Sequence, residues 1–207
     1  MSMKKIMKLA AQIVFFGAVW GLAEASLGYL LHFLPPLVAG LVMFPIAVYI
    51  LMKAFKATGS RSALVLVGLV AAGIKAVDFL LPGISVFKTI NPMISIMFES
   101  LVVAVAIPML SSKKQFARIT GSIGVSMGWR LGYILYMVAQ FLVSGSMTKF
   151  ISSPALTLEF VILNGLLSAV LVYGVLLLEA RTSIKAKFRP IYAPVLLAAA
   201  LGIQLLV

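Results

Sequence analysis

The chain has 207 residues, of which 63% are hydrophobic and only 11% are charged. Soluble globular domains are roughly half apolar and a quarter charged, so this composition excludes a soluble domain and indicates one integral membrane domain over residues 1–207. The absence of cysteine excludes disulfides, thiolate metal sites and cysteine nucleophiles.

Apolar segments follow one another along the chain, separated by charges, prolines and small polar clusters. Each is roughly 17–27 residues long, which matches the ~20 residues that a helix needs to cross a ~30 Å hydrocarbon core. Asn91-Pro92 and Ser153-Pro154 each predict a helix start, with a capping side chain before a proline at the first helical position. The predicted spans are 8–34, 36–52, 62–81, 91–110, 117–143, 154–178 and 190–207.

The last segment is only just long enough to cross a membrane, so we predict an all-α integral membrane protein, a single bundle of six to seven transmembrane helices. The N-terminal MSMKKIMK, followed by an apolar stretch and Ala23-Glu24-Ala25, is also similar to a signal peptide with its cleavage site. The apolar run continues without a break to Leu34, which favours a first transmembrane helix instead.

The seventeen Lys and Arg residues are distributed unequally between the two ends of these segments. Lys88 and Lys149 lie at one set of ends, Lys75 and Arg130 lie within segments, and the others lie at the opposite ends. These others are Lys4, Lys5, Lys8, Lys53, Lys56, Arg61, Lys113, Lys114, Arg118, Arg181, Lys185, Lys187 and Arg189. By the positive-inside rule the N-terminus is cytoplasmic. The net charge of +12 therefore reflects orientation in a cell (inner) membrane, and we expect the lipid bilayer rather than nucleic acid as a partner.

Acidic residues occur inside the predicted spans, and the topology puts them in the outer half of the membrane. They are Glu24, Asp78, Glu99 and Glu159. A charged residue at the bilayer centre costs on the order of 3 kcal/mol, so by default it marks a functional site. These acids outnumber Lys75 and Arg130, and the excess calls for a bound cation, protonation or water.

Helical spacing suggests which of these charges pair. Lys75 and Asp78 lie three residues apart on one predicted helix, so we expect them to pair with each other. Glu24, Glu99 and Glu159 have no basic residue on the same face of their own helices, and we expect at least one of them to face a cavity and neutralise a ligand. The alternative is that these groups only hold helices together.

One face of the fifth segment carries an aromatic stripe, formed by Trp129, Tyr133, Tyr136 and Gln140. Near carboxylates, such a stripe suits a flat cationic ligand through cation–π contacts, and we expect the aromatic rings to stack on it. The alternative is an ordinary interfacial belt. The remaining substrate-binding candidates are polar groups that would contact the edge of the ligand, namely Asn91, Asn164, Gln140 and His32.

Small residues recur every four positions in two places. The ladders are Gly17, Gly21 and Ala25 on the first segment, and Gly124, Gly128 and Gly132 on the fifth. Such ladders let helices approach closely, most often within one chain. The second interpretation is that Gly17, Gly21 and Ala25 form a docking face for another membrane subunit.

Motifs for catalysis are missing from the sequence. It has no phosphate-binding loop, no Gly-x-Ser-x-Gly elbow and no His-Glu-x-x-His pair. A single histidine cannot build a multi-histidine metal site. We therefore expect no enzyme activity, no cofactor and no metal site.

A basic chain of about this size, with small residues along its first helix and an outward polar pocket, resembles the substrate-binding S components of energy-coupling factor (ECF) transporters. The resemblance implies capture of a vitamin or other micronutrient near the outer face, a transmembrane coupling subunit that contacts the small residues of the first helix, and separate ATPases. Most S components have six helices, and the nickel and cobalt members begin Met-His, whereas this chain begins Met-Ser.

These observations together predict a membrane-embedded substrate-binding subunit for uptake of a small, cationic nutrient. Outer loops at 82–90 and 144–153 would gate its site. The first alternative is a small proton-coupled secondary transporter or channel in which the carboxylates carry protons. The second is a structural subunit of a membrane complex, with its glycine ladders buried against a partner.

Overall fold

The computed structural model describes residues 2–31, 33, 36–181 and 190–206, and within these ranges the chain forms helices and no strands. The prediction of an all-α protein is therefore confirmed. The α-helices are α1 Met3–Ala23, α2 Tyr29–Leu31, α3 Pro36–Thr58, α4 Arg61–Lys75, α5 Val86–Leu110, α6 Gln115–Ser144, α7 Pro154–Leu158, α8 Asn164–Arg181 and α9 Tyr192–Leu206. Wider π-helical turns, η1 Glu24–Gly28 and η4 Glu159–Leu163, join α1 to α2 and α7 to α8, and the 3₁₀ segments are η2 Ala76–Leu80 and η3 Lys149–Ile151.

Five helical stretches of the described residues are long and apolar enough to cross a membrane. They are Met3–Gly28, Val38–Thr58, Arg61–Leu80, Val86–Leu110 and Pro154–Arg181. Helix α6 is not among them, although its 30 residues are long enough, because Arg118, Arg130 and several glycines and serines lower its hydropathy. Helix α9 is apolar but has only 15 residues, or ~22 Å at 1.5 Å per residue.

The helix starts follow the predicted capping in one case and not in the other. Ser153 caps α7 by accepting a hydrogen bond from the Leu156 N–H at 3.3 Å, with Pro154 in the first helical position. Helix α5, however, begins at Val86, so the predicted start at Asn91-Pro92 is wrong and much of the predicted loop 82–90 is helical. Proline removes one backbone hydrogen bond, and an otherwise apolar helix can continue past it.

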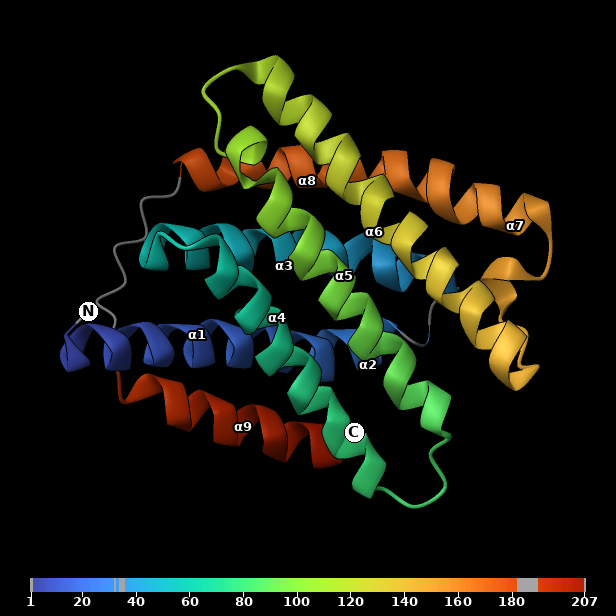
Figure 1. The fold of residues 1–207 in the computed structure, drawn as a ribbon, viewed down its shortest axis with the longest axis horizontal. Helices are drawn as coiled ribbons and strands as arrows, with labels where there is room; N and C mark the ends of the chain where they lie inside the picture. Colours follow the sequence, from blue (N-terminus) through green and yellow to red (C-terminus); the bar gives the residue numbers. More distant parts are fainter. Residues whose placement is uncertain (1, 32, 34–35, 182–189, 207) are drawn as a thin grey trace.

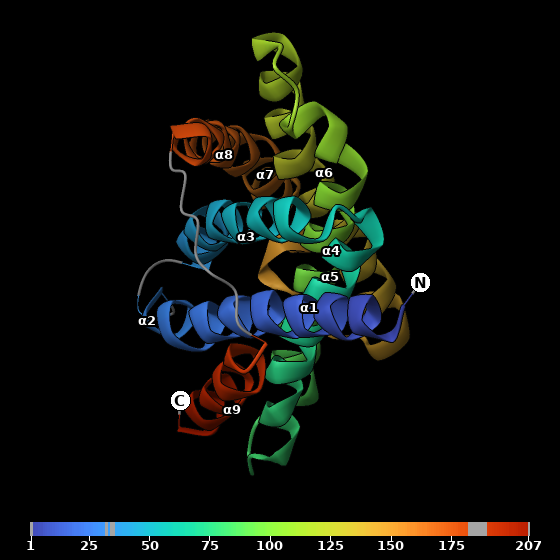
Figure 2. The ribbon, with the colours of Figure 1, turned by 90° about the vertical axis from the view of Figure 1, so that its left-hand side faces the viewer.

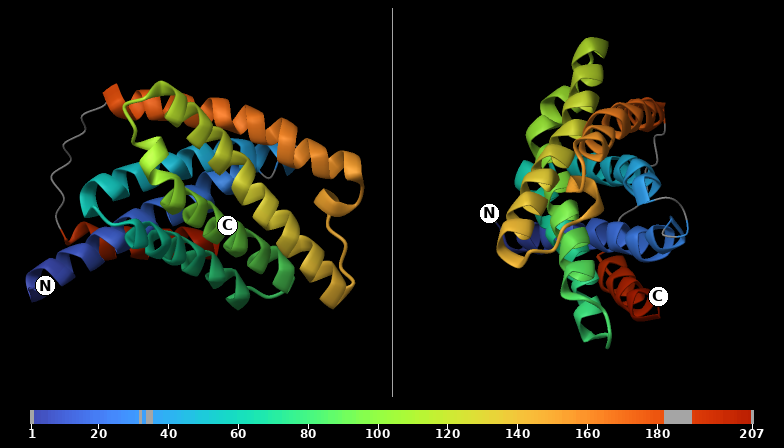
Figure 3. Two further views of the ribbon diagram at one scale, coloured as in Figure 1. Left: turned by 45° about the horizontal axis from the view of Figure 1, so that its top comes forward. Right: turned by 90° about the vertical axis from the view of Figure 1, so that its right-hand side faces the viewer.

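The long helices form a closed ring. Going round it, α1 packs on α4, α4 on α5, α5 on α6, α6 on α8, α8 on α3, and α3 on α1. Helix α9 lies outside the ring, against α1 (Figure 1). Viewed along the bundle, α8, α3, α1 and α9 form one side, and α4, α5 and α6 form the other (Figure 2; the opposite view is in Figure 3).

The two ends of the bundle differ in charge. The N-terminus, the α3–α4 turn and the end of α8 lie at one end (left in Figure 1), and the α4–α5 and α6–α7 connections lie at the other. Most basic residues of the predicted cytoplasmic set belong to the first end; Lys185, Lys187 and Arg189 of that set lie outside the described residues. The alternation of charge along the sequence therefore corresponds to a separation of charge in space.

Glycines set the contact between α1 and α4. A side-chain carbon added at Gly17 would lie 2.5 Å from Cβ of Val70, and one at Gly21 would collide with Ile74. Both glycines and Ala25 are buried inside the chain. These contacts favour the packing interpretation of the ladder at Gly17 and Gly21, where α4 covers the helix.

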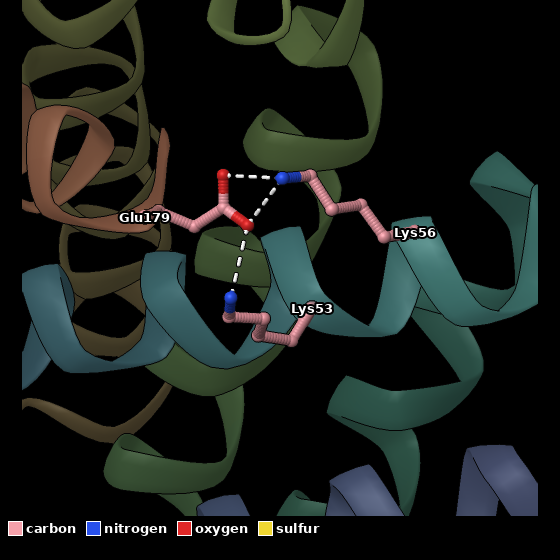
Figure 4. Close-up of polar contacts among 3 residues, drawn as sticks. All are labelled: Lys53, Lys56 and Glu179. Atoms are coloured by element: carbon pink, nitrogen blue, oxygen red, sulfur yellow. Dashed lines mark hydrogen bonds and ion pairs between the residues drawn. The ribbon is translucent and has the colours of Figure 1, made fainter. Parts of the chain in front are cut away.

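An ion cluster joins α3 to α8 at the basic end of the bundle (Figure 4). Glu179 is only 4% exposed, and its Oε1 lies 2.6 Å from Nζ of Lys56 and 3.2 Å from Nζ of Lys53. Lys56 also donates to Oε2 at 2.7 Å. Sequence reasoning did not single out Glu179, since it falls just beyond the predicted span 154–178. The cluster connects residues more than a hundred positions apart, so it stabilises the ring rather than one helix.

We predict that Gly17→Ala lowers the melting temperature of the detergent-purified protein, since forcing a methyl group into a packed contact costs about 1–3 kcal/mol. The matched control is Gly124→Ala, where an added carbon meets nothing within 4 Å. Alanine is the better helix former, so the control should leave the melting temperature unchanged or slightly raised. Equal melting temperatures for the two variants would contradict the close packing of α1 on α4.

We also predict that Glu179→Gln lowers the free energy of unfolding by roughly 1–3 kcal/mol. This range lies between the losses on breaking exposed and buried ion pairs, because Glu179 is buried whereas Lys56 is partly exposed. Denaturant unfolding in detergent measures this. Lys113→Gln, an exposed lysine at the same end, should have no measurable effect. If both variants unfold alike, the cluster does not hold α3 to α8.

Candidate ligand cavity

A cavity of about 270 Å³ lies at the end of the bundle opposite the basic end. Its polar lining consists of Glu24, Lys75, Asp78, Lys88 and Gln204, and its less polar lining of Ala25, Gly28, Leu81, Ile84 and Pro92. These residues come from η1, from α4 and η2, from the connection between η2 and α5, from the first part of α5, and from α9. The volume equals that of about nine liquid waters at ~30 Å³ each, so the cavity has room for a small molecule.

Departures from regular α-helix place two acids at this cavity. Glu24 begins the π-helical turn η1, and Asp78 lies in the 3₁₀ segment η2. A third acid, Glu159, begins the second π-helical turn, η4, at a different part of the bundle. Single π-helical turns inside α-helices occur frequently at functional sites. The acids of the predicted spans therefore coincide with irregular turns, except Glu99, which lies within α5.

Asp78 is held by two groups on the cavity wall. Nζ of Lys75 lies 2.9 Å from its Oδ2, which confirms the predicted pair. On the other side, Nε2 of Gln204 donates to its Oδ1 at 2.5 Å. Because Gln204 belongs to α9, this hydrogen bond ties the outlying helix to the ring. Both carboxylate oxygens of Asp78 are thus engaged within the protein.

Glu24 connects the cavity to the interior of the ring. Its Oε1 accepts a hydrogen bond from Nε1 of the fully buried Trp20 at 3.1 Å. A side-chain carbon added at Gly28 would lie 3.4 Å from the other oxygen, Oε2, so the two residues lie close together on the cavity wall. Glu24 is also close enough to Glu99 for the two charges to act on each other.

Glu99 and Arg130 form a buried pair of opposite charges inside the ring. Oε1 of Glu99 accepts a hydrogen bond from Ser95 Oγ at 3.1 Å, whereas Oε2 has no hydrogen-bond partner among the described residues. The fully buried Arg130 donates to the carbonyl oxygens of Ser126 at 2.6 Å and Gly40 at 3.4 Å. Glu99 and Arg130 interact through space, so each offsets part of the desolvation cost of the other.

One ring of the aromatic stripe, Trp129, lies against a cation of the chain itself. The guanidinium of Arg130 lies 4.5 Å from the ring centre of Trp129 and 5.6 Å from that of Phe160. Trp129 also packs on Phe44 at 5.7 Å, and the buried Tyr133 packs on Phe160 at 6.2 Å. None of these residues lines the cavity. Trp129 of the expected ligand wall is thus engaged by Arg130, because a desolvated guanidinium is stabilised by aromatic faces.

The other predicted site residues are spread around the bundle. The hydroxyl of Tyr136 donates to Oδ1 of Asn91 at 2.9 Å, and Nδ2 of Asn164 donates to the backbone oxygen of Glu159 at 3.1 Å. Gln140 is buried, and its Oε1 has no hydrogen-bond partner among the described residues. These side chains do not line the cavity either. His32 lies outside the described residues.

Of the predicted substrate-binding residues that the structure describes, only Glu24 lines the cavity. Lys75 and Asp78 were expected to pair with each other, not to line a site, and Lys88 and Gln204 were not singled out. Lys88 was assigned to a loop, but it lies in the first turn of α5, which begins at Val86. Gln204 lies in the last predicted span. A lone polar side chain in such an apolar run indicates a candidate functional residue, so the sequence did contain a signal for it. Within the described ranges, no three His, Cys, Asp or Glu side chains come together as metal ligands.

Comparison with known proteins gives no match: no family model, curated protein or solved structure is similar to this chain.

We predict that Glu99 and Arg130 are energetically coupled. Glu99→Gln and Arg130→Gln should each lower the free energy of unfolding. The loss in the double variant should be smaller than the sum of the two single losses by at least about 1 kcal/mol, because removing both groups leaves no unbalanced buried charge. The control is the combination of Arg130→Gln with Glu179→Gln at the far end of the bundle, which should be additive. Additivity in both combinations would contradict the pairing.

Proposed function

We propose that the chain is a membrane-embedded substrate-binding subunit for uptake of a small nutrient that carries a cationic group, energised by separate ATPase subunits. The observation that carries this proposal is a cavity with charged walls inside an otherwise apolar bundle. Charged groups at membrane depth are expensive, and a bound substrate is one reason to keep them there. Glu24 is the group that would hold the cationic part of the ligand.

The separation of charge supports an orientation for this subunit. With the basic end in the cytoplasm, the N-terminus is cytoplasmic and the cavity opens toward the outer side of the cell (inner) membrane. In that orientation α6 runs alongside the five apolar stretches as a sixth span, and α9 is the seventh only if the bilayer is thin enough for its ~22 Å. The cavity is then in position to take up a nutrient from outside.

The sequence indicates that the chain needs partners. The chain has no phosphate-binding loop, so an ATP-driven process needs ATPase subunits from elsewhere. A coupling subunit would have to use a surface other than Gly17 and Gly21, which are covered by α4.

A second function, proton-coupled transport by the chain alone, is favoured by one observation. Glu24 and Glu99 are acids close enough to interact, one at the cavity and one buried with Oε2 lacking a hydrogen-bond partner among the described residues. Such a pair suits a step in which a proton passes between carboxylates. The two functions differ in what the purified chain does by itself in liposomes.

We predict that Glu24→Gln abolishes binding of the native small molecule, because the carboxylate that faces its cationic group is gone. Native mass spectrometry of the gently purified protein detects the co-purifying molecule and its loss. Glu159→Gln is the matched control, since Glu159 also begins a π-helical turn but does not line the cavity, and it should retain the ligand.

The molecule identified in this way is then tested in liposomes that contain the chain alone under a pH gradient. The binding-subunit function predicts binding without uptake. Uptake driven by the gradient would favour the proton-coupled transporter, and loss of ligand in both variants would contradict the role of Glu24.

A further inference from the structure

We infer that the cationic group of the ligand is a nitrogen that still carries N–H bonds, and that Oε1 of Gln204 accepts a hydrogen bond from it. This inference rests on the proposed function and narrows its substrate class to protonated amines, amidines and guanidines, excluding fully alkylated ammonium compounds. It is drawn from the orientation, burial and hydrogen bonding of Gln204 on the cavity wall.

The orientation of the Gln204 amide is set by its neighbour. The carboxylate of Asp78 pairs with Lys75 at 2.9 Å, and an ionised carboxylate only accepts hydrogen bonds. Gln204 must therefore turn its amide nitrogen toward Asp78, and Nε2 donates to Oδ1 at 2.5 Å. The carbonyl oxygen, Oε1, is on the other side of the same planar group and cannot exchange places with the nitrogen without breaking this hydrogen bond.

Oε1 of Gln204 is a buried acceptor that the protein leaves without a donor. The residue is only 2% exposed, and Oε1 has no hydrogen-bond partner among the described residues. Buried polar atoms are nearly always hydrogen-bonded, and one that is left unpaired costs free energy. Because the same side chain lines the cavity, the cavity is the place from which a donor can come.

A small rotation of the side chain brings this oxygen to a ligand. The terminal torsion of a glutamine is broad, so the amide can tilt toward the cavity while Nε2 stays near Asp78. A molecule in the cavity then contacts an amide oxygen, which accepts from N–H or O–H groups and repels other acceptors.

The helix that carries Gln204 also lies beside Glu24. Helix α9 packs against both η1, which begins at Glu24, and η2, which contains Asp78. A carboxylate accepts several hydrogen bonds, so the bond from Trp20 does not prevent Glu24 from accepting another. A cationic nitrogen that bears hydrogens can donate to oxygens on both η1 and α9, whereas a nitrogen with four carbon substituents has the charge but no donor.

The expected selectivity comes from the cost of leaving Oε1 of Gln204 unpaired. Water can donate to this oxygen when no ligand is bound, and a ligand that displaces the water must replace its hydrogen bond. A protonated amine does so, whereas a quaternary ammonium group fills the space and leaves the buried oxygen without a donor. Sites that hydrogen-bond a substrate strongly reject the analogue that lacks the bonding group.

The experiment measures binding by calorimetry to the full-length protein in detergent. The probes are ethylamine, butylamine and benzylamine, each also with one, two or three methyl groups added to the nitrogen. The last methylation removes the last N–H of the cation, whereas the earlier ones leave at least one. In at least one of these series we expect the last methylation to weaken binding about tenfold or more, and each earlier one about threefold or less.

Gln204→Met should abolish the extra loss at the last methylation, because methionine has a similar length and no amide oxygen. The matched control is Gln140→Met, which removes another buried amide whose Oε1 has no partner in the described part of the chain. Gln140 does not line the cavity, so this control should keep the extra loss.

Three outcomes would overturn the inference. The first is a last methylation that weakens binding no more than the earlier ones, and the second is an extra loss that persists in Gln204→Met. The third is a native ligand, identified by mass spectrometry, whose cationic nitrogen carries no hydrogen. In all three the binding function stands, because that function is tested separately by whether Glu24→Gln loses the native ligand.

Absence of binding by every probe to protein with a normal melting temperature also overturns the inference. The proposed function is then still decided by the native ligand found in mass spectrometry.

Discussion

The close approach of α1 and α4 is the contact on which the rest of the structure depends. Gly17 and Gly21 allow α1 to lie against Val70 and Ile74, which no larger residue would permit without displacement. This contact brings the end of α1 beside the end of α4, so that Glu24 and Asp78 share one cavity. Helix α9 then packs on α1 through Ala18 and Ala200, and its Gln204 reaches Asp78.

The low polarity of a membrane explains how the ionisable side chains inside the bundle are arranged. A membrane offers no water to an ionised group, so each must find its partner inside the protein. Lys75 forms an ion pair with Asp78, and Glu179 forms ion pairs with Lys53 and Lys56. The guanidinium of Arg130 packs on aromatic rings and interacts through space with the charge of Glu99. Glu24, which lines the cavity, carries the functional proposal.

The irregular turns of the helices have a role consistent with this arrangement. A π-helical turn changes the direction in which the following side chains point, and it occurs here where Glu24 and Glu159 lie. At Glu24 the turn also places Ala25 and Gly28, both small, on the cavity wall. Single π-helical turns inside α-helices are frequent at functional sites, and the turn at Glu24 lies at the cavity.

The sequence by itself determined the helical class, the approximate extent of the helices and the Lys75–Asp78 pair, because each depends on the composition or spacing of one segment in a lipid environment. Only the tertiary structure decided that Lys88 and Gln204 join Glu24 at one cavity, and that Arg130 lies against Trp129 and Phe160. It also decided that the glycine stripe of α1 is covered by α4. These outcomes depend on the rotation and axial position of each helix relative to its neighbours, which are set by interlocking side chains from distant segments and leave no periodic signal in any one of them.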